Sequence, residues 1–155
     1  MIGEETRFHF KGASEKQSFQ REPDILLHLK SNDFPAGLRV AELGGLVLNN
    51  DGGSLLGLLV EHIHGNRTLD EAVDGSEEER EKWMQQLRDT AKQLHDGGVV
   101  WGDAKLDNVL IDSNGDVWVI DFGGGCARGW VDGELEGTVE GDSQGLSRIP
   151  GFLGV

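Results

Sequence analysis

A short hairpin pattern in the second half of the chain constrains its fold more than any other feature of the sequence. Two runs of β-forming residues, Val109–Asp112 and Val117–Ile120, flank the polar segment SNGD, which suits a four-residue hairpin loop. If Asp112 pairs with Val117, the two runs form an antiparallel ladder with its register fixed up to its open end. Both faces of this ladder are apolar, so we expect other elements to cover it on both sides.

The predicted ladder brings two polar side chains together at its open end. One step beyond the apolar runs, Asn108 lies opposite Asp121. Directly paired positions hold their Cβ atoms roughly 4.5–5.5 Å apart. At that separation an amide oxygen and a carboxylate oxygen can share a small hard cation such as Mg²⁺. The alternative is an ordinary hairpin in which Asn108 and Asp121 only cap the ends.

The residues around the hairpin favour the metal-binding interpretation. Asp103 lies in the loop that leads into the hairpin, and Lys105 follows two positions later. A carboxylate that orients a nucleophile, a nearby cation and two metal ligands are the groups that phosphoryl transfer requires. The pattern DSNGDVWVIDFG also suggests a calcium-binding loop. A calcium-binding loop requires a glycine at the position of Val117 and a glutamate at the position of Gly123. The sequence therefore argues against such a loop.

Hydrophobic spacing in the first half of the chain predicts a small sheet and one helix. Arg7–Lys11 alternates apolar and polar residues and is predicted to be a strand, with its two phenylalanines on one face. Gly45–Leu48 and Leu55–Glu61 are predicted strands joined by the turn signal NNDGG. Ser18–Lys30 is predicted to be a helix that buries four apolar residues: Phe19, Ile25, Leu26 and Leu29.

Two further helices are expected in the second half. The clearer one begins with a capping box formed by Ser76 and Glu79 and ends at Gly97-Gly98. Its apolar residues recur at steps of four, four and three and predict one buried stripe: Trp83, Leu87, Ala91 and Leu94. A short helix is expected to begin at Asp142 and to bury two residues, Leu146 and Ile149.

Composition narrows the class of protein and its partners. Acidic residues outnumber basic ones 28 to 14, which argues against nucleic acid or an anionic membrane as the partner. The longest apolar run, Leu55–Val60, is too short to cross a bilayer. Cys126 is the only cysteine, so no internal disulfide can form and a cytoplasmic, intracellular location is expected. A chain of 155 residues suits one domain, or two small lobes that share a core.

Two motifs resemble those of the protein-kinase-like superfamily. Trp101–Asn108, WGDAKLDN, resembles its catalytic loop, in which an aspartate precedes an asparagine by five positions. Asp121-Phe122-Gly123 is similar to the metal-binding DFG triplet, and a β-hairpin between the two motifs also fits. The segment His95–Asn108, the glycines after Phe122 and the later GTVEGD further resemble small fungal protein-kinase-like proteins.

This resemblance implies an α+β fold class, as a truncated two-lobe protein-kinase-like fold. Residues 1–60 would form a small β-rich N-lobe remnant, and residues 61–155 a partial, helical C-lobe. Only six residues precede the first predicted strand, and the chain stops soon after Asp142. We therefore expect the glycine-rich loop that covers the phosphates, and most later C-lobe helices, to be missing.

The resemblance also implies roles for the residues near the hairpin. Asp103 would accept or orient the substrate hydroxyl, and Lys105 would neutralise the γ-phosphate of ATP. Asn108 and Asp121 would hold Mg²⁺. Asp142 resembles the aspartate that starts a C-lobe helix and braces the catalytic loop, and a plain helix N-cap is its alternative role.

Residues of the first half would bind the rest of the nucleotide, according to the same resemblance. Lys11 resembles the strand lysine that grips the α- and β-phosphates, and Glu22 resembles its partner on a helix. The segment LLVEHIHGNRTL resembles the hinge between lobes, whose main-chain groups would meet the adenine edge at Glu61, His62 and Ile63.

Three functional hypotheses follow. The first is an ATP- and Mg²⁺-dependent phosphotransferase of protein kinase type, acting on a protein Ser/Thr or another hydroxyl. The second is a catalytically inactive pseudokinase that binds a nucleotide or a partner protein. The expected loss of the phosphate lid favours this second hypothesis, whereas the intact set of Asp103, Lys105, Asn108 and Asp121 opposes it. The third is a plain α+β domain in which the motifs are coincidental.

Overall fold

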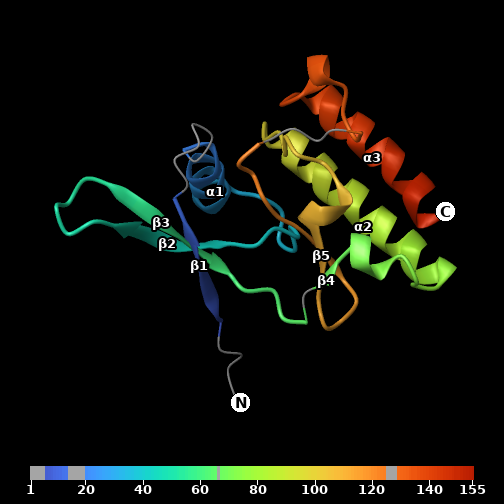
Figure 1. Ribbon diagram of the computed structural model, residues 1–155, viewed down its shortest axis with the longest axis horizontal. Helices are drawn as coiled ribbons and strands as arrows, with labels where there is room; N and C mark the ends of the chain where they lie inside the picture. The colour runs from blue at the N-terminus through green and yellow to red at the C-terminus, as the bar shows by residue number, and fades with distance from the viewer. Residues whose placement is uncertain (1–5, 14–19, 66, 125–128) are drawn as a thin grey trace.

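The computed structural model describes residues 6–13, 20–65, 67–124 and 129–155. In these ranges the chain forms two small antiparallel sheets and three α-helices (Figure 1). The first sheet and one helix form one half, and the second sheet with the other two helices forms the other. The elements in chain order are β1 (Phe8–Gly12), α1 (Arg21–Ser31), β2 (Leu43–Leu48), β3 (Leu55–Glu61), β4 (Arg67–Thr68), α2 (Glu77–Asp96), β5 (Val109–Ile111), β6 (Val117–Val119) and α3 (Val139–Leu153). Three short 3₁₀ turns complete them: η1 (Asp70–Ala72), η2 (Leu106–Asn108) and η3 (Gly133–Leu135).

The first sheet has the strand order β1-β3-β2 and confirms the three strands predicted in this half. β1 pairs with β3 from Phe8 opposite Glu61 to Gly12 opposite Gly57. Phe8 and Phe10 are 45% and 56% exposed, so they do not belong to the core. A Cβ atom at Gly57 would meet the Phe10 ring at 2.4 Å, which shows that this ring lies directly over the glycine of the neighbouring strand.

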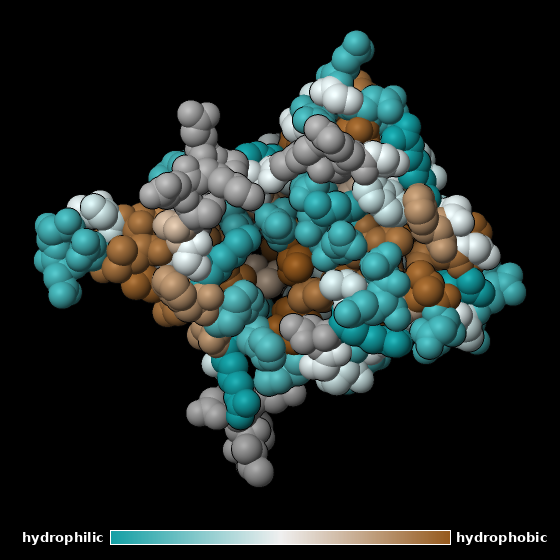
Figure 2. All heavy atoms as spheres, in the orientation of Figure 1, coloured by the Kyte–Doolittle hydropathy of each residue, from teal (hydrophilic) through white to brown (hydrophobic). Residues whose placement is uncertain are grey.

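The hairpin formed by β2 and β3 projects away from the rest of the molecule (Figure 1). Leu46, Leu48 and Leu56 on this hairpin are exposed. Figure 2 shows their apolar surface at the left of the view, ending in the polar turn. The part of the sheet nearer α1 is packed against the rest of the molecule, and its residues Leu58 and Val60 belong to the core.

Helix α1 begins at Arg21, and the predicted helix residues Ser18 and Phe19 lie outside the described residues. Pro23 is the third residue of the helix, where its missing N–H removes no intrahelical hydrogen bond. Leu26 is buried as predicted, while Ile25 and Leu29 are partly buried against the same core. The helix ends at Ser31, one residue beyond the predicted end.

The second sheet has the order β4-β5-β6 and contains the predicted hairpin, but in a different register. Val109 faces Val119, and Ile111 faces Val117. Asn108 therefore falls opposite Ile120, whose N–H donates to the Asn108 carbonyl at 3.0 Å. The predicted pairing of Asn108 with Asp121 across the ladder is wrong by one residue.

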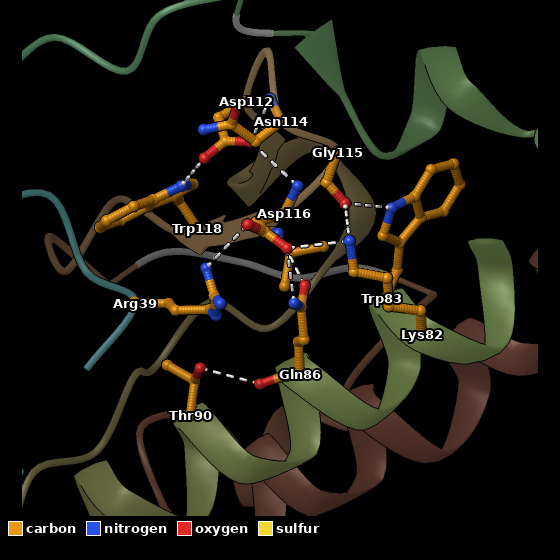
Figure 3. A network of polar contacts seen from close by, with 11 residues as sticks. Arg39, Lys82, Trp83, Gln86, Thr90, Asp112, Asn114, Gly115, Asp116 and Trp118 are labelled. Atoms are coloured by element: carbon orange, nitrogen blue, oxygen red, sulfur yellow. Dashed lines mark hydrogen bonds and ion pairs between the residues drawn. The ribbon is translucent and has the colours of Figure 1, made fainter. Parts of the chain in front are cut away.

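The turn chemistry explains this shift of register. Asp112 Oδ1 accepts the N–H groups of Asn114 and Asp116, both at 2.9 Å, and its N–H donates to the Asp116 carbonyl (Figure 3). Asp112 thus pairs with Asp116, leaving a loop of three residues in place of the four expected. Gly115, at φ 75°, supplies the left-handed residue that such loops use.

The same turn is fastened to α2 (Figure 3). Trp83 Nε1 and Lys82 Nζ both donate to the Gly115 carbonyl at 3.1 Å. The Asp116 carboxylate accepts from Gln86 at 2.8 Å and lies 2.9 Å from Lys82 and 3.7 Å from Arg39. The Gln86 hydrogen bond, followed by those two cations, lowers the pKa of Asp116 below its ordinary value of 3.8. Asp116, which a calcium-binding loop would use as a metal ligand, is therefore engaged in contacts within the protein.

Helix α2 confirms the clearest sequence prediction. Ser76 accepts the N–H of Glu79, and the Glu79 carboxylate accepts the N–H of Ser76, which is the predicted capping box. The helix ends at Asp96, before the predicted glycine stop. All four residues of the predicted stripe are buried: Trp83, Leu87, Ala91 and Leu94.

Helix α3 is longer than predicted and begins at Val139. Thr138 is its N-cap, with its hydroxyl accepting the N–H of Gly141 at 3.0 Å. Asp142 therefore lies inside the first turn, and the alternative in which it is the N-cap is wrong. Ile149 is fully buried and Leu146 partly buried, as expected for the inner face of this helix.

One continuous core joins the two halves. Val40, in the linker between α1 and β2, forms a parallel bridge with Val119 of β6, and the Val119 N–H donates to the Arg39 carbonyl at 2.9 Å. Buried residues of the first half, such as Leu26, belong to the same cluster as Trp83 of α2. The division into residues 1–60 and 61–155 remains a prediction. None of the helices in the described ranges is long and apolar enough to cross a membrane.

Candidate active site

The loop between α2 and β5 gathers three of the predicted site residues. Asn108 Nδ2 donates to both the Asp103 carbonyl, at 2.9 Å, and Asp103 Oδ2, at 2.7 Å. Lys105 Nζ lies 3.2 Å from the same Oδ2 atom. Asp103 is only 4% exposed, and its Oδ1 has no hydrogen-bond partner among the described residues. One oxygen of this carboxylate is therefore fixed, and the described part of the chain offers the other no hydrogen-bond donor.

Asp142 holds the start of this loop in place from α3. Its Oδ2 accepts the Trp101 N–H and its Oδ1 accepts the Gly102 N–H, both at 2.8 Å. His95 Nε2 lies 2.7 Å from Oδ2. Asp142 is 2% exposed, so these contacts are buried. This geometry is the bracing arrangement that the sequence resemblance implied for Asp142.

Three more predicted residues meet where the two halves of the chain adjoin. Lys11 Nζ lies 2.6 Å from Glu22 Oε2 and 3.6 Å from Asp121 Oδ1. Burial lowers the pKa of Lys11, but the hydrogen bond and charge of Glu22, together with Asp121, outweigh it and raise that pKa above 10.5. Lys11 is therefore a cation at neutral pH. Asp121 has φ 64° and its Oδ1 also accepts the Gly123 N–H at 3.2 Å.

The left-handed backbone of Asp121 has a consequence for the metal hypothesis. The β ladder ends before Asp121, so ladder geometry no longer determines the direction of its side chain. Asn108 donates to Asp103, and among the described residues it shares no hydrogen bond with Asp121. The described residues also contain no cluster of three or more His, Cys, Asp or Glu side chains suited to a metal ion. A metal at this site would need ligands beyond Asn108 and Asp121, such as phosphate oxygens and water.

A cleft of about 190 Å³ lies next to the Lys11 cluster. Lys11, Glu22, Glu61, Ile63 and Asp121 line it, together with apolar residues that include Val60, Leu110 and Ile120. The cleft brings the predicted phosphate-binding and hinge residues together. His62 is the exception. It lines a neighbouring polar pocket, which shares Glu61 and Ile63 with the cleft, and its ring lies 5.4 Å from that of His64.

Sequence reasoning missed one residue of this region. Arg21, which immediately precedes Glu22, donates from Nη2 to the Val100 carbonyl at 3.0 Å and from Nη1 to the Trp101 carbonyl at 3.2 Å. It also donates to the Phe122 carbonyl. These partners lie 79 to 101 residues away in the sequence. No local pattern could have indicated them.

The arrangement of these elements defines a protein-kinase-like fold. A small sheet carries Lys11, its adjoining helix carries Glu22, and a connecting segment leads to a loop with Asp103 and Asn108 followed by a hairpin and Asp121. A family model described as "Protein kinase domain" matches residues 9–141 of the chain. The chain therefore belongs to the protein kinase domain family.

Individual relatives agree with this assignment. CBL-interacting protein kinase 21 of Oryza sativa subsp. japonica is 39% identical over 69 residues, which are 43% of this chain and 13% of the relative. The probable serine/threonine-protein kinase MARK-C of Dictyostelium discoideum is 30% identical over 112 residues, which are 70% of this chain and 14% of the relative. The chain thus spans a small part of these curated proteins.

A solved structure gives the same fold. The PK-1 kinase of the Cydia pomonella granulovirus superposes with a TM-score of 0.61 at 25% sequence identity. The alignment covers 78% of this chain and 44% of the viral kinase. The α+β, two-lobe, kinase-like fold expected from the sequence motifs is confirmed.

Proposed function

We propose that this chain is an ATP- and Mg²⁺-dependent phosphotransferase of protein kinase type, with a protein hydroxyl as the acceptor. The observation that carries the proposal is the buried Asp103 carboxylate, whose Oδ1 has no partner among the described residues. Buried polar atoms are nearly always hydrogen-bonded, because an unpaired one costs about 1–3 kcal/mol. An oxygen left in this condition is suited to receive a donor from a ligand.

A substrate hydroxyl is a donor of the appropriate kind. Asn108 and Lys105 hold Asp103 Oδ2, so the carboxylate cannot turn freely and Oδ1 keeps one direction. In phosphoryl transfer, such a carboxylate orients the attacking hydroxyl and takes its proton. Lys105, the cation beside it, would balance the negative charge of the phosphate being transferred.

The cluster around Lys11 is suited to the remaining phosphates. Glu22 is 5% exposed and holds the Lys11 ammonium beside the cleft, and Asp121 lies on the same ammonium. Asp121 and the amide oxygen of Asn108 would provide two of the ligands of Mg²⁺. The bound ion would shield the negative charges of the phosphates. Since Asn108 Nδ2 donates to Asp103, the amide oxygen of Asn108 is the atom that remains for the metal.

The cleft beyond Lys11 is suited to a flat apolar ring. Val60, Leu110 and Ile120 provide apolar walls. The N–H groups of Glu61 and His62 donate to the carbonyls of Glu42 and Arg7, at 2.8 and 2.7 Å. A nucleotide base would therefore form its hydrogen bonds with the backbone of Ile63 and the carbonyl of Glu61.

Nucleotide binding tests the proposal directly. Isothermal titration with Mg·ATP is compared between the wild type, Asp121→Asn, and Asp107→Asn, an exposed acid beside Asn108. We expect binding by the wild type and Asp107→Asn, and at least about tenfold weaker binding by Asp121→Asn, because one metal ligand loses its charge.

Three results would count against the proposal. An absence of binding in the wild type would overturn it, as would equal binding by all three proteins. Binding without any phosphate transfer would instead support the pseudokinase alternative.

A further inference from the structure

Arg21 at the start of α1 is a cation that bonds to backbone carbonyls of two distant segments. Its guanidinium donates to Val100 and Trp101, which precede Asp103, and to Phe122, which follows Asp121. Among the described residues Arg21 takes part in no ion pair with a carboxylate; its polar contacts are these carbonyl groups. A planar guanidinium with several N–H groups can serve three acceptors at once, which a lysine ammonium on a flexible stem does less well.

The backbone leaves room for this guanidinium at Gly102. Gly102 has φ 86°, and a Cβ atom there would lie 2.8 Å from Arg21 Nη2 and 3.0 Å from its Cζ. Any larger residue would therefore be strained and would also press on the guanidinium. The absence of a side chain at Gly102, next to Asp103, thus makes room for Arg21, next to Glu22.

We infer that Arg21 is a positioning residue that locks α1, the loop before Asp103 and the segment after Asp121 into a single arrangement. The lock places Glu22 against Lys11 and holds Asp121 beside the cleft before any ligand binds. The expected effect of this lock on nucleotide binding rests on the function proposed above. The lock, meaning the three carbonyl contacts of Arg21, does not depend on that function.

The consequence is a site that is already assembled in the free protein. If the three carbonyl contacts are lost, α1 can move relative to the Asp103 loop, and Lys11 and Asp121 lose their fixed separation. Displacements of about 1 Å in such a site are enough to cost roughly a hundredfold in rate. Arg21 touches neither the cleft nor the Asp103 carboxylate in this arrangement, so it acts through the residues that do.

Hydrogen exchange on the protein without nucleotide tests the lock. Arg21→Met keeps the aliphatic stem and removes the donors, Arg21→Lys keeps the charge, and Arg148→Met is a matched control at an exposed ion pair on α3. We expect Arg21→Met to speed exchange at least about tenfold in residues 100–108 and 120–124, while residues 87–94 of α2 stay as in the wild type. Arg21→Lys should fall between the two. Unchanged exchange in both segments, or an equal rise throughout the chain, would overturn the inference.

Titration of the same variants with Mg·ATP tests the consequence for the site. We expect Arg21→Met to bind at least about tenfold more weakly than the wild type and Arg148→Met to bind equally. Equal binding by Arg21→Met, together with faster exchange in the two segments, would refute the link between the lock and the nucleotide site. If the wild type binds no nucleotide but the exchange pattern is as expected, the lock stands and the proposed function fails.

Discussion

The two halves of the molecule hold their site residues in different ways. In the second half, Asp103 and Asp142 are buried and receive hydrogen bonds from neighbouring backbone and side-chain groups. In the first half, Lys11 is 38% exposed and reaches its partners through a long flexible side chain. The strand that carries it also exposes both its phenylalanines. The second half therefore fixes Asp103 and Asp142 through buried hydrogen bonds. At the site, the first half meets the second through the partly exposed Lys11 beside Asp121 and through the carbonyl contacts of Arg21.

The buried acids of the two halves provide the largest expected contrast. Asp142→Ala leaves the N–H groups of Trp101 and Gly102 without an acceptor in the interior, so we expect a loss of about 3–5 kcal/mol in unfolding free energy. Glu22→Ala frees Lys11, which can turn toward water, so its cost should be about 1 kcal/mol. Urea denaturation of both variants measures the difference. Equal losses would contradict the expected contrast between these two buried acids.

A glycine of each half should tolerate a side chain to a different degree. Gly115→Ala puts a side chain on a residue with φ 75° in the hairpin turn and should cost about 1–2 kcal/mol. Gly45→Ala in β2 meets open space and has no such conformation, so it should stay within about 0.5 kcal/mol of the wild type. Thermal and urea unfolding report both values. A neutral Gly115→Ala variant would contradict the three-residue turn and hence the observed register.

The smallest expected difference concerns how one acid of each half contributes to stability at low pH. The pKa of Asp116 is lowered, so the contribution of its carboxylate is fully present above the ordinary value of 3.8 and is lost as the pH falls through the folded-state pKa. Asp116→Asn should therefore cost about 1 kcal/mol at neutral pH, and its difference from the wild type should disappear below that pKa. Asp33→Asn, an exposed acid of the first half, should match the wild type throughout. A pH-independent difference for Asp116→Asn would argue against the ionic contacts with Lys82 and Arg39.

Local patterns in the sequence predicted the elements well. The capping box and the apolar stripe were enough to place α2, because both depend on residues within one helix. Local alternation also predicted β1, β2, β3 and the hairpin of β5 and β6. The two-residue strand β4 was not predicted, because so short a segment carries no periodic pattern. The start of α3 was placed three residues late because Thr138, rather than Asp142, provides the cap.

Features that depend on side-chain contacts across the fold could not be predicted. The hairpin register shifted because the Asp112 side chain closes a tighter turn than loop length alone indicated. The role of Arg21 could not be predicted because its carbonyl partners are distant in the sequence. The sequence predicts Asn108 beside Asp121 across the ladder, whereas the 3₁₀ turn Leu106–Asn108 places Asn108 against Asp103. Phe19 and Cys126 lie outside the described residues.

The proposed role of Asp103 is tested by comparing phosphate transfer from ATP by the wild type and by Asp103→Asn. We expect the wild type to transfer labelled phosphate to a protein in a Mg²⁺-dependent reaction. Asp103→Asn should bind Mg·ATP with the same affinity and transfer roughly 10²–10⁴-fold more slowly, because it keeps the hydrogen bond from Asn108 but loses the base. Equal rates in the two proteins, or an inactive wild type that binds Mg·ATP normally, would contradict it.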